Sequence, residues 1–282
     1  MMGRSPPLPT DAASAPMTAS RPRRRTPRAA VPAVSSIEVS EEAGVRYLHF
    51  GSRWIQGAMR LSRTHALELE YTRDMMFPLL LHPEADWPRN VLQIGLGAAS
   101  ITRFLHRHRP GAHLVVAEIE PRVVAAARQH FRLPEDPERV SIEIADGAAY
   151  VASAGRSFDW ILVDGFDERG LAGALDTRAF YRRCRACLAP DGLIVANLLR
   201  RSRGCEASVA RMAEAFDGRV LVLPVCASGN TIAIGATGAH LSLERTALRA
   251  AAEALRRATG LNLVRTVGRL AASAPASGPP RL

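Results

Sequence analysis

Apolar and polar positions alternate in a regular rhythm over the central part of the chain. Short apolar runs occur at residues 91–94, 114–117, 141–145, 160–163 and 193–196. Stretches with helical spacing of apolar residues separate them, at 100–108, 121–131, 148–153 and 178–188. Strands that alternate with helices in this way indicate a parallel sheet covered by helices on both faces.

Two later apolar runs, at 220–225 and 231–235, are separated only by residues 226–230. This connection is too short for the crossover that parallel strands need, so we expect an antiparallel hairpin. Five parallel strands followed by such a hairpin are typical of the Rossmann-like fold of S-adenosylmethionine-dependent methyltransferases. The predicted fold class is therefore α/β, with a mostly parallel seven-stranded sheet.

The flanking segments predict smaller elements. Strand patterns at 37–40, 46–50 and 53–59 predict a small antiparallel sheet, and helical spacing runs from 66 to 81. Residues 241–258 predict an amphipathic helix whose arginine face is solvated. The expected organisation is a disordered tail (1–35), a small N-terminal β domain with its linking helix (36–84), a Rossmann-like domain (85–239), a C-terminal helical segment (240–271) and a second disordered tail (272–282).

Composition fits a globular protein of enzyme size. The 282 residues are 47% hydrophobic and 23% charged, which is enough chain for a sizeable core. Four cysteines are too few for a disulfide framework, and the pair Cys184 and Cys187 lacks a second pair for a zinc site, so we interpret them as structural. No apolar stretch is long enough to cross a membrane or resembles a signal peptide. We expect a cytoplasmic protein.

The net charge of +10 comes from arginine alone and lies at the two ends. Residues 1–35 contain six Arg and one acid, residues 240–282 contain seven Arg and two acids, and the segment between them is neutral. A protein that binds nucleic acid usually carries its excess charge on a folded surface. We therefore favour a solvated tail, and contact with RNA or with an acidic membrane surface is the alternative.

The ends of the predicted strands carry candidate ligand-binding residues. Gly95 and Gly97 lie where the first strand turns into its helix, so a ligand can approach the backbone there. Glu118 ends the second strand, where a carboxylate can accept both hydroxyls of a ribose, although a surface acid would look the same. Asp146 and Gly147 end the third strand, where Asp146 can meet an adenine amino group or simply form a turn.

The fourth strand ends in a pair of carboxylates. Asp164 lies at the tip of this central strand and Asp167 follows on the covering loop. Paired carboxylates suit a cationic amine, because they bind its ammonium group and one of them can take its proton. Helix capping is the alternative role for Asp167.

In combination these residues resemble the spermidine synthase (polyamine aminopropyltransferase) family over about residues 45–238. The resemblance rests on Val91-Leu-Gln-Ile-Gly-Leu-Gly97, Val116-Ala-Glu-Ile-Glu-Pro121, Ala145-Asp-Gly147, Phe158-Asp159, Asp164 with Asp167, Phe180-Tyr181 and Leu188-Ala-Pro-Asp-Gly192, preceded by Gln56 and Glu70-Tyr71. It implies a small N-terminal β domain, a catalytic Rossmann-like domain and a homodimer. It further implies decarboxylated S-adenosylmethionine as donor, putrescine or a related amine as acceptor, and no metal.

The resemblance also implies roles for individual residues. Gln56 and Tyr71 would line the donor and amine site, Glu118 would hold the ribose and Asp146 the adenine. Asp164 would be the base and Asp167 an amine anchor.

The chain departs from the family pattern at two places. Ala98 stands where members carry an Asp that grips the donor's ammonium group, and Thr72-Arg73 follow the tyrosine where members carry His or Gln and then Glu. An Arg near a diamine would repel it. Three functions stay open from the sequence: aminopropyl transfer, methyl transfer from ordinary S-adenosylmethionine, and nucleoside binding without catalysis.

Overall fold

The structure is a computed structural model that describes residues 1, 36–51, 55–155, 157–166, 171–199, 204–238, 244–273 and 282. The elements are β1 (Ile37–Glu42), β2 (Val45–Phe50), β3 (Ile55–Arg60), α1 (Glu70–Asp74), α2 (Pro78–Leu81), β4 (Asn90–Ile94), α3 (Ser100–His108), β5 (His113–Glu118), α4 (Pro121–Phe131), β6 (Val140–Ile144), α5 (Gly147–Ser153), β7 (Phe158–Val163), the 3-10 helix η1 (Gly173–Asp176), α6 (Arg178–Ala186), β8 (Leu188–Leu199), α7 (Cys205–Ala215), β9 (Val220–Val222), β10 (Asn230–Ala236), α8 (Arg245–Thr259) and α9 (Val264–Ser273).

The main sheet has seven strands in the order β6-β5-β4-β7-β8-β10-β9. The first five strands of this order are parallel, and β10 is antiparallel to both β8 and β9. The predicted α/β fold and its mostly parallel seven-stranded sheet are therefore confirmed. The β9–β10 hairpin also forms as predicted, but β10 is the inner strand, inserted between β8 and the edge strand β9.

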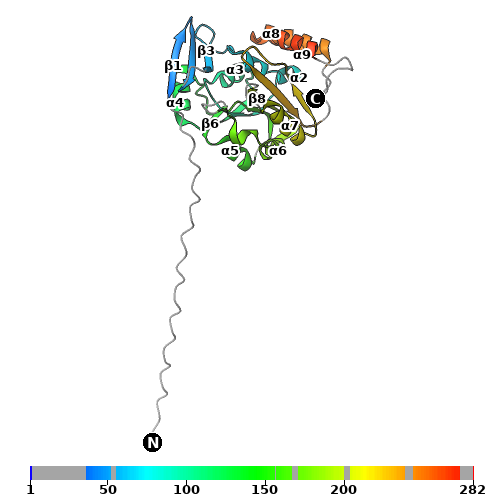
Figure 1. Ribbon diagram of the computed structural model, residues 1–282. Helices are drawn as coiled ribbons and strands as arrows, with labels where there is room; N and C mark the ends of the chain where they lie inside the picture. Colours follow the sequence, from blue (N-terminus) through cyan, green and yellow to red (C-terminus); the bar gives the residue numbers. More distant parts are fainter. Residues whose placement is uncertain are drawn as a thin grey trace. The chain divides into compact units, whose positions relative to one another are not determined.

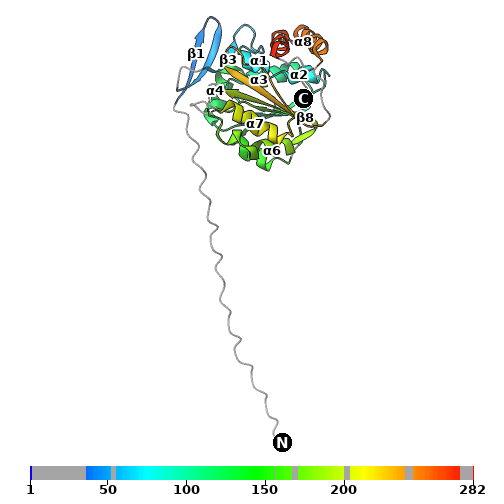
Figure 2. The same cartoon turned by 45° about the vertical axis from the view of Figure 1, so that its right-hand side comes forward.

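Successive side chains of a strand point to opposite faces of the sheet. Both of these faces are buried. Val91 and Trp160 pack on one face with α1, α2, α3, α8 and α9. Leu92 and Ile161 pack on the other face with α5, α6 and α7. Figures 1 and 2 show these two helical layers on opposite sides of the sheet. The continuous apolar runs of the sequence follow from this burial on two sides.

The predicted N-terminal sheet is present as the antiparallel order β1-β2-β3. Ala43 and Gly44 join β1 to β2, and both have a positive φ, as a tight hairpin turn requires. Side chains of β2 and β3 pack with α4 and with the turn after β4 in a separate apolar cluster. This small sheet therefore borders the first turn of the Rossmann-like sheet.

Two helical predictions differ from the structure. The single helix expected over 66–81 is two short helices, α1 and α2, because the turn at residues 75–77 separates them. Helix α7, between β8 and β9, was not predicted from the pattern. Its buried residues are only Ser208, Met212 and Ala215, which leave a weak apolar stripe.

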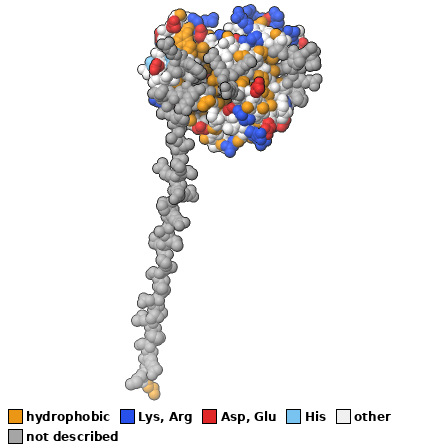
Figure 3. Space-filling view, viewed as in Figure 1, with side chains coloured by type: hydrophobic (Ala, Val, Ile, Leu, Met, Phe, Trp, Pro, Cys, Tyr) orange, Lys and Arg blue, Asp and Glu red, His pale blue; other side chains and the backbone are white. Residues whose placement is uncertain are grey.

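The C-terminal helix α8 has the predicted amphipathic character. Leu248, Ala252 and Leu255 are buried, and the arginines of α8 are exposed. Figure 3 shows Arg side chains gathered on the surface over α8. No helix in the described part of the chain is long and apolar enough to span a membrane.

Candidate active site

The candidate site lies at the carboxyl ends of the parallel strands, where the strand order reverses. Chain order runs from β4 to β5 and β6 in one direction, and from β7 to β8 in the other. A crevice opens between two such neighbouring strands in α/β sheets, and ligands bind there. The Asp164 N–H donates to the Ile94 carbonyl at 2.9 Å, so the ends of β7 and β4 are held side by side.

The turn after β4 can form only because of its glycines. Gly95 has φ +89°, and a Cβ atom there would lie 2.2 Å from the Asp164 carbonyl oxygen. Gly97 also has a positive φ, of +51°. Buried Gln93 holds the turn from behind, because its Nε2 donates to the Gly95 carbonyl at 2.7 Å and its Oε1 accepts from Thr102 at 2.9 Å. The requirement for glycine at position 95 thus comes from packing between strand ends.

Strand β3 lies directly against this turn. A Cβ atom on Gly57 would lie 2.5 Å from the Ala98 Cβ, and a Cβ on Gly97 would lie 3.3 Å from the Gln56 carbonyl oxygen. Ala98 is buried. Gln56 is therefore placed beside the turn, and the side chain at position 98 packs on β3.

Glu118 ends β5 as a buried carboxylate that faces the turn after β4. Its Oε2 accepts from the Leu96 N–H at 2.8 Å, and its Oε1 accepts from the Glu120 N–H at 2.9 Å. Burial raises the pKa of Glu118, and these backbone hydrogen bonds oppose the rise. A carboxylate has about four lone-pair positions, so both oxygens can still accept a ligand hydroxyl.

Asp146 and Gly147 begin α5 at the end of β6. Asp146 is exposed and accepts the Ala149 N–H at 2.8 Å, so it is the N-cap of α5. A Cβ on Gly147 would lie 2.3 Å from the Ile94 side chain and 3.3 Å from the Leu175 side chain. Gly147 therefore permits close packing on β4, and one Asp146 oxygen stays available.

Asp164 lies at the tip of β7 between two hydrogen-bond donors. The Asn197 amide on β8 donates to its Oδ1 at 2.8 Å, and the Tyr71 hydroxyl of α1 donates to the same carboxylate. Burial raises the pKa of Asp164, and both hydrogen bonds oppose the rise. Burial, and then the Asp164 charge, hold the pKa of Tyr71 well above its usual value, so this hydroxyl stays protonated.

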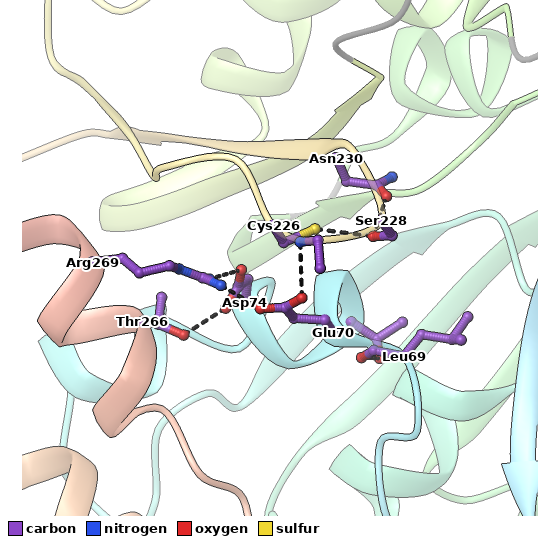
Figure 4. Close-up of polar contacts among 10 residues, drawn as sticks. Leu69, Glu70, Asp74, Cys226, Ser228, Asn230, Thr266 and Arg269 are labelled. Carbon is purple, nitrogen blue, oxygen red and sulfur yellow. Dashed lines mark hydrogen bonds and ion pairs between the residues drawn. The ribbon is translucent and has the colours of Figure 1, made fainter. Parts of the chain in front are cut away.

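Helix α1 is held in place by contacts with α9 and with the turn before β10, which Figure 4 shows. Glu70 accepts the Ala227 N–H at 2.9 Å and pairs with Arg269 of α9. Arg269 also pairs with buried Asp74 at 2.5 Å, and Thr266 donates to Asp74 at 2.6 Å. Tyr71, between these two acids in the chain, is thereby held from α9 and from the turn before β10.

Thr72 and Arg73, which depart from the family pattern, have defined places. Arg73 donates to the carbonyls of Leu67 and Glu68 at 3.2 and 3.1 Å, so part of its guanidinium is engaged by its own chain segment. Thr72 is buried, and its hydroxyl donates to the Leu69 carbonyl. Neither side chain makes a contact with Asp164 that matches the one made by Tyr71.

The predicted residues thus gather at one edge of the sheet. Gly95 and Gly97 are in the turn after β4 with Gln56 and Glu118 beside it, Asp146 and Gly147 follow β6, and Tyr71 meets Asp164. Asp167 lies outside the described residues. Among the described residues, none of Glu118, Asp146 and Asp164 forms an ion pair.

Sequence reasoning missed three polar side chains of the site: Gln93, Asn197 and Asn230. All three are buried. Asn197 and Asn230 directly follow and precede apolar runs, at 193–196 and 231–235. For Asn197, its place near the carboxyl end of a buried strand was the available signal, and that signal was used only for the carboxylates.

Other chemical groups lie apart from this edge. Cys184 and Cys187 are buried and free, and burial raises the pKa of both thiols. Within the described ranges, no group of three or more His, Cys, Asp or Glu side chains is arranged to hold a metal ion. A pocket of about 760 Å³ lies beside α1, between residues 62–67 and residues 259–266.

Comparison with known proteins identifies the family. The family model for the spermine/spermidine synthase domain matches residues 68–201. A polyamine aminopropyltransferase of Chromobacterium violaceum is 39% identical over 249 residues, which cover 88% of this chain and 94% of that protein.

Two solved structures share the fold. A probable spermidine synthase from Corynebacterium glutamicum superposes with a TM-score of 0.66 at 23% identity, over 80% of this chain and 91% of that one. Human methyltransferase-like protein 13, solved with SAH, has a TM-score of 0.61 at 25% identity, over 68% and 93% of the two chains. The fold is common to both kinds of protein, whereas the long sequence match is to the aminopropyltransferase. The chain belongs to the spermine/spermidine synthase family.

Proposed function

We propose that this protein transfers the aminopropyl group of decarboxylated S-adenosylmethionine to the amine nitrogen of a polyamine acceptor such as putrescine. Three carboxylates with no cationic partner in the described part of the chain carry this proposal: Glu118, Asp146 and Asp164. They lie at or just after the carboxyl ends of the three parallel strands β5, β6 and β7. Both reactants are cations, and clustered negative charge attracts them.

Glu118 and Asp146 suit the adenosine half of the donor. Glu118 has lone pairs left for two ribose hydroxyls, and Asp146 has a free oxygen for an adenine amino group. Ile119, next to Glu118, is 38% exposed, and Leu175 packs against Gly147. These apolar side chains suit a flat aromatic ring next to the polar contacts.

Asp164 carries the chemistry in this proposal. The donor's sulfonium supplies an activated leaving group, so the residues mainly orient the reactants. Asp164 binds the acceptor's ammonium group and accepts one proton from it, which leaves a neutral nitrogen that forms the new C–N bond as the C–S bond breaks. Tyr71 and Asn197 hold the carboxylate during this transfer, and Asp167 is the proposed anchor for the acceptor's second amine.

Assembly and location belong to the same proposal. The protein is proposed to be a cytoplasmic homodimer, and the sequence-based domain boundaries remain predictions. Sedimentation equilibrium measures the number of subunits directly, and a monomer at micromolar concentration would contradict the dimer.

Methyl transfer is the second candidate function, because Ala98 supplies no carboxylate for the donor's ammonium group. The long match to an aminopropyltransferase argues against it. The purified protein is incubated with putrescine and either donor, and mass spectrometry identifies the products. Spermidine and methylthioadenosine from the decarboxylated donor support the proposal. S-adenosylhomocysteine formed from ordinary S-adenosylmethionine would support methyl transfer instead.

The Asp164→Asn variant tests the mechanism. It keeps the shape of the side chain but removes the charge and the proton acceptor, so we expect kcat to fall by about 10²–10⁴-fold. Asp159→Asn is the matched control, since Asp159 lies at the opposite end of β7 and accepts the N–H groups of Arg89 and Asn90 at 2.8 Å. A folded Asp164→Asn protein that keeps wild-type turnover would disprove the role of this base.

A further inference from the structure

Asp164 is the end of a hydrogen-bond chain that crosses from β8 to β10. Asn197 donates to Asp164 Oδ1 at 2.8 Å, and Asn230 donates to Asn197 Oδ1 at 2.9 Å. Ser228 in turn donates to Asn230 Oδ1 at 2.7 Å, and the Sγ of Cys226 lies 3.0 Å from the Ser228 hydroxyl oxygen. Figure 4 shows Cys226, Ser228 and Asn230 along one turn.

The chemistry of the groups sets the direction of this chain. An ionised carboxylate only accepts hydrogen bonds, so the NH₂ of Asn197 must face Asp164 and its oxygen must face Asn230. That oxygen needs a donor, so Asn230 presents its NH₂ there and its oxygen to Ser228. The one Ser228 proton is then used, and the Cys226 thiol is left as the donor in their contact. Every proton of the chain points toward Asp164.

We propose that Asn197 and Asn230 are positioning residues, whose one-directional hydrogen-bond chain holds the Asp164 carboxylate in the orientation and the ionised form that accept a proton. This inference rests on the proposed function. It deepens that function by naming residues that act through Asp164. Asn197 and Asn230 are 5% and 7% exposed, so water cannot readily replace the amide groups. A chain of polarised hydrogen bonds in such surroundings strengthens its last member, which here ends on the charged group.

The other titratable groups around Asp164 do not take over this task. Tyr71 faces Asp164 from α1 and is itself a donor to it. Cys226 faces Tyr71 from the turn before β10, and burial keeps Tyr71 protonated. Glu70 faces the same turn, but Arg269 neutralises it. Of the two donors to Asp164, Asn197 is therefore the one whose own orientation depends on a further side chain.

Asn230→Asp is the sharpest test, because it keeps the shape of the side chain but cannot donate to Asn197 when ionised. It does not contact Asp164, but its added negative charge also raises the pKa of Asp164, so Ser228→Ala, which adds no charge, is measured beside it. We expect the acidic limb of the kcat–pH profile to move up by about one pH unit, since Asp164 loses support for its charge. We also expect kcat near pH 7 to fall about tenfold with KM for both substrates little changed. Ile232→Val is the matched control, because Ile232 is buried on the same strand as Asn230 but takes no part in the hydrogen-bond chain.

Ser228→Ala separates loss of the hydrogen bond from the effect of added charge, and it also serves if Asn230→Asp does not fold. Ser228 is exposed, so its removal spares the core, and we expect a smaller shift in the same direction. A ¹³C NMR titration of aspartate-labelled protein reads the Asp164 carboxyl without any activity, with Asp164→Asn assigning the signal. An Asp164 signal that titrates at the same pH in wild type, Asn230→Asp and Ser228→Ala overturns the proposal. Absence of aminopropyl transfer in wild type overturns the proposed function only, because the NMR titration still decides whether the chain acts on Asp164.

Discussion

Glu118 illustrates how much one side chain does in this site. Its two oxygens each accept a backbone N–H, from Leu96 in the turn after β4 and from Glu120 before α4. The same carboxylate is the proposed acceptor for the ribose hydroxyls. In this proposal Glu118 both shapes the turn and contacts the ligand, so neither task can be removed without the other.

Glu118→Gln is expected to weaken binding of methylthioadenosine by about 1–3 kcal/mol, the cost of losing hydrogen bonds to a charged acceptor. The amide NH₂ of Gln would also face a backbone N–H, which adds to the loss. Isothermal titration calorimetry measures the affinity. Glu143→Gln, on the adjacent strand β6, is the control, and equal affinity in wild type and Glu118→Gln would remove the ribose assignment.

At the scale of elements, the short helix α1 depends on helix α9. Residues nearly 200 positions apart meet there, since Arg269 pairs with both Glu70 and Asp74. Asp74 is only 2% exposed, and burial raises its pKa although Arg269 and Thr266 oppose the rise. Helix α9 thus neutralises the buried acid of α1, the helix that carries Tyr71.

Arg269→Ala is expected to destabilise the fold by about 3–5 kcal/mol, because it leaves a buried carboxylate without its cation. The loss should grow with pH. An acid whose pKa is higher in the folded state than in the unfolded state favours the folded state at pH values below its unfolded pKa. This contribution is lost as the pH rises through its folded pKa. Denaturant unfolding near pH 5 and near pH 8 measures both effects. Arg265→Ala on the same helix is the control, and an equal loss at the two pH values would contradict the role of Asp74.

At the scale of the whole molecule, charge and working structure are separated. The segment 36–239 contains the site and is neutral, while the excess arginine lies in residues 1–35 and 240–282. Part of the C-terminal excess is exposed on α8 (Figure 3). Residues 2–35 lie outside the described residues, so the prediction for the N-terminal segment rests on its sequence.

Deletion of residues 1–35 is expected to leave melting temperature and kcat unchanged, because this segment has no apolar period that could pack on a core. Differential scanning calorimetry and a steady-state assay compare the two proteins. Filter binding to a generic RNA, with and without the segment, tests the alternative role. A marked loss of turnover or of thermal stability on deletion would show that the segment belongs to the working protein.

The sequence by itself determined the architecture and the acidic side of the site. Runs of apolar residues alternate with helical spacing over 91–196, and this order allows few topologies other than a parallel sheet with two helical layers. Once the strands were placed, Glu118, Asp146 and Asp164 had to lie along the same edge of the sheet, because the carboxyl ends of parallel strands share one edge. The local pattern of apolar and polar residues was sufficient wherever a single short segment determines the element or the residue at its end.

Only the tertiary structure decided what supports these carboxylates. Asn197 and Asn230 belong to different strands and act together because β10 is inserted next to β8. Gly95 needs φ +89° and the close approach of Asp164, and Arg269 meets Asp74 across 195 positions of chain. No local pattern encodes such contacts, since they depend on which strand becomes a neighbour and how closely two backbones approach.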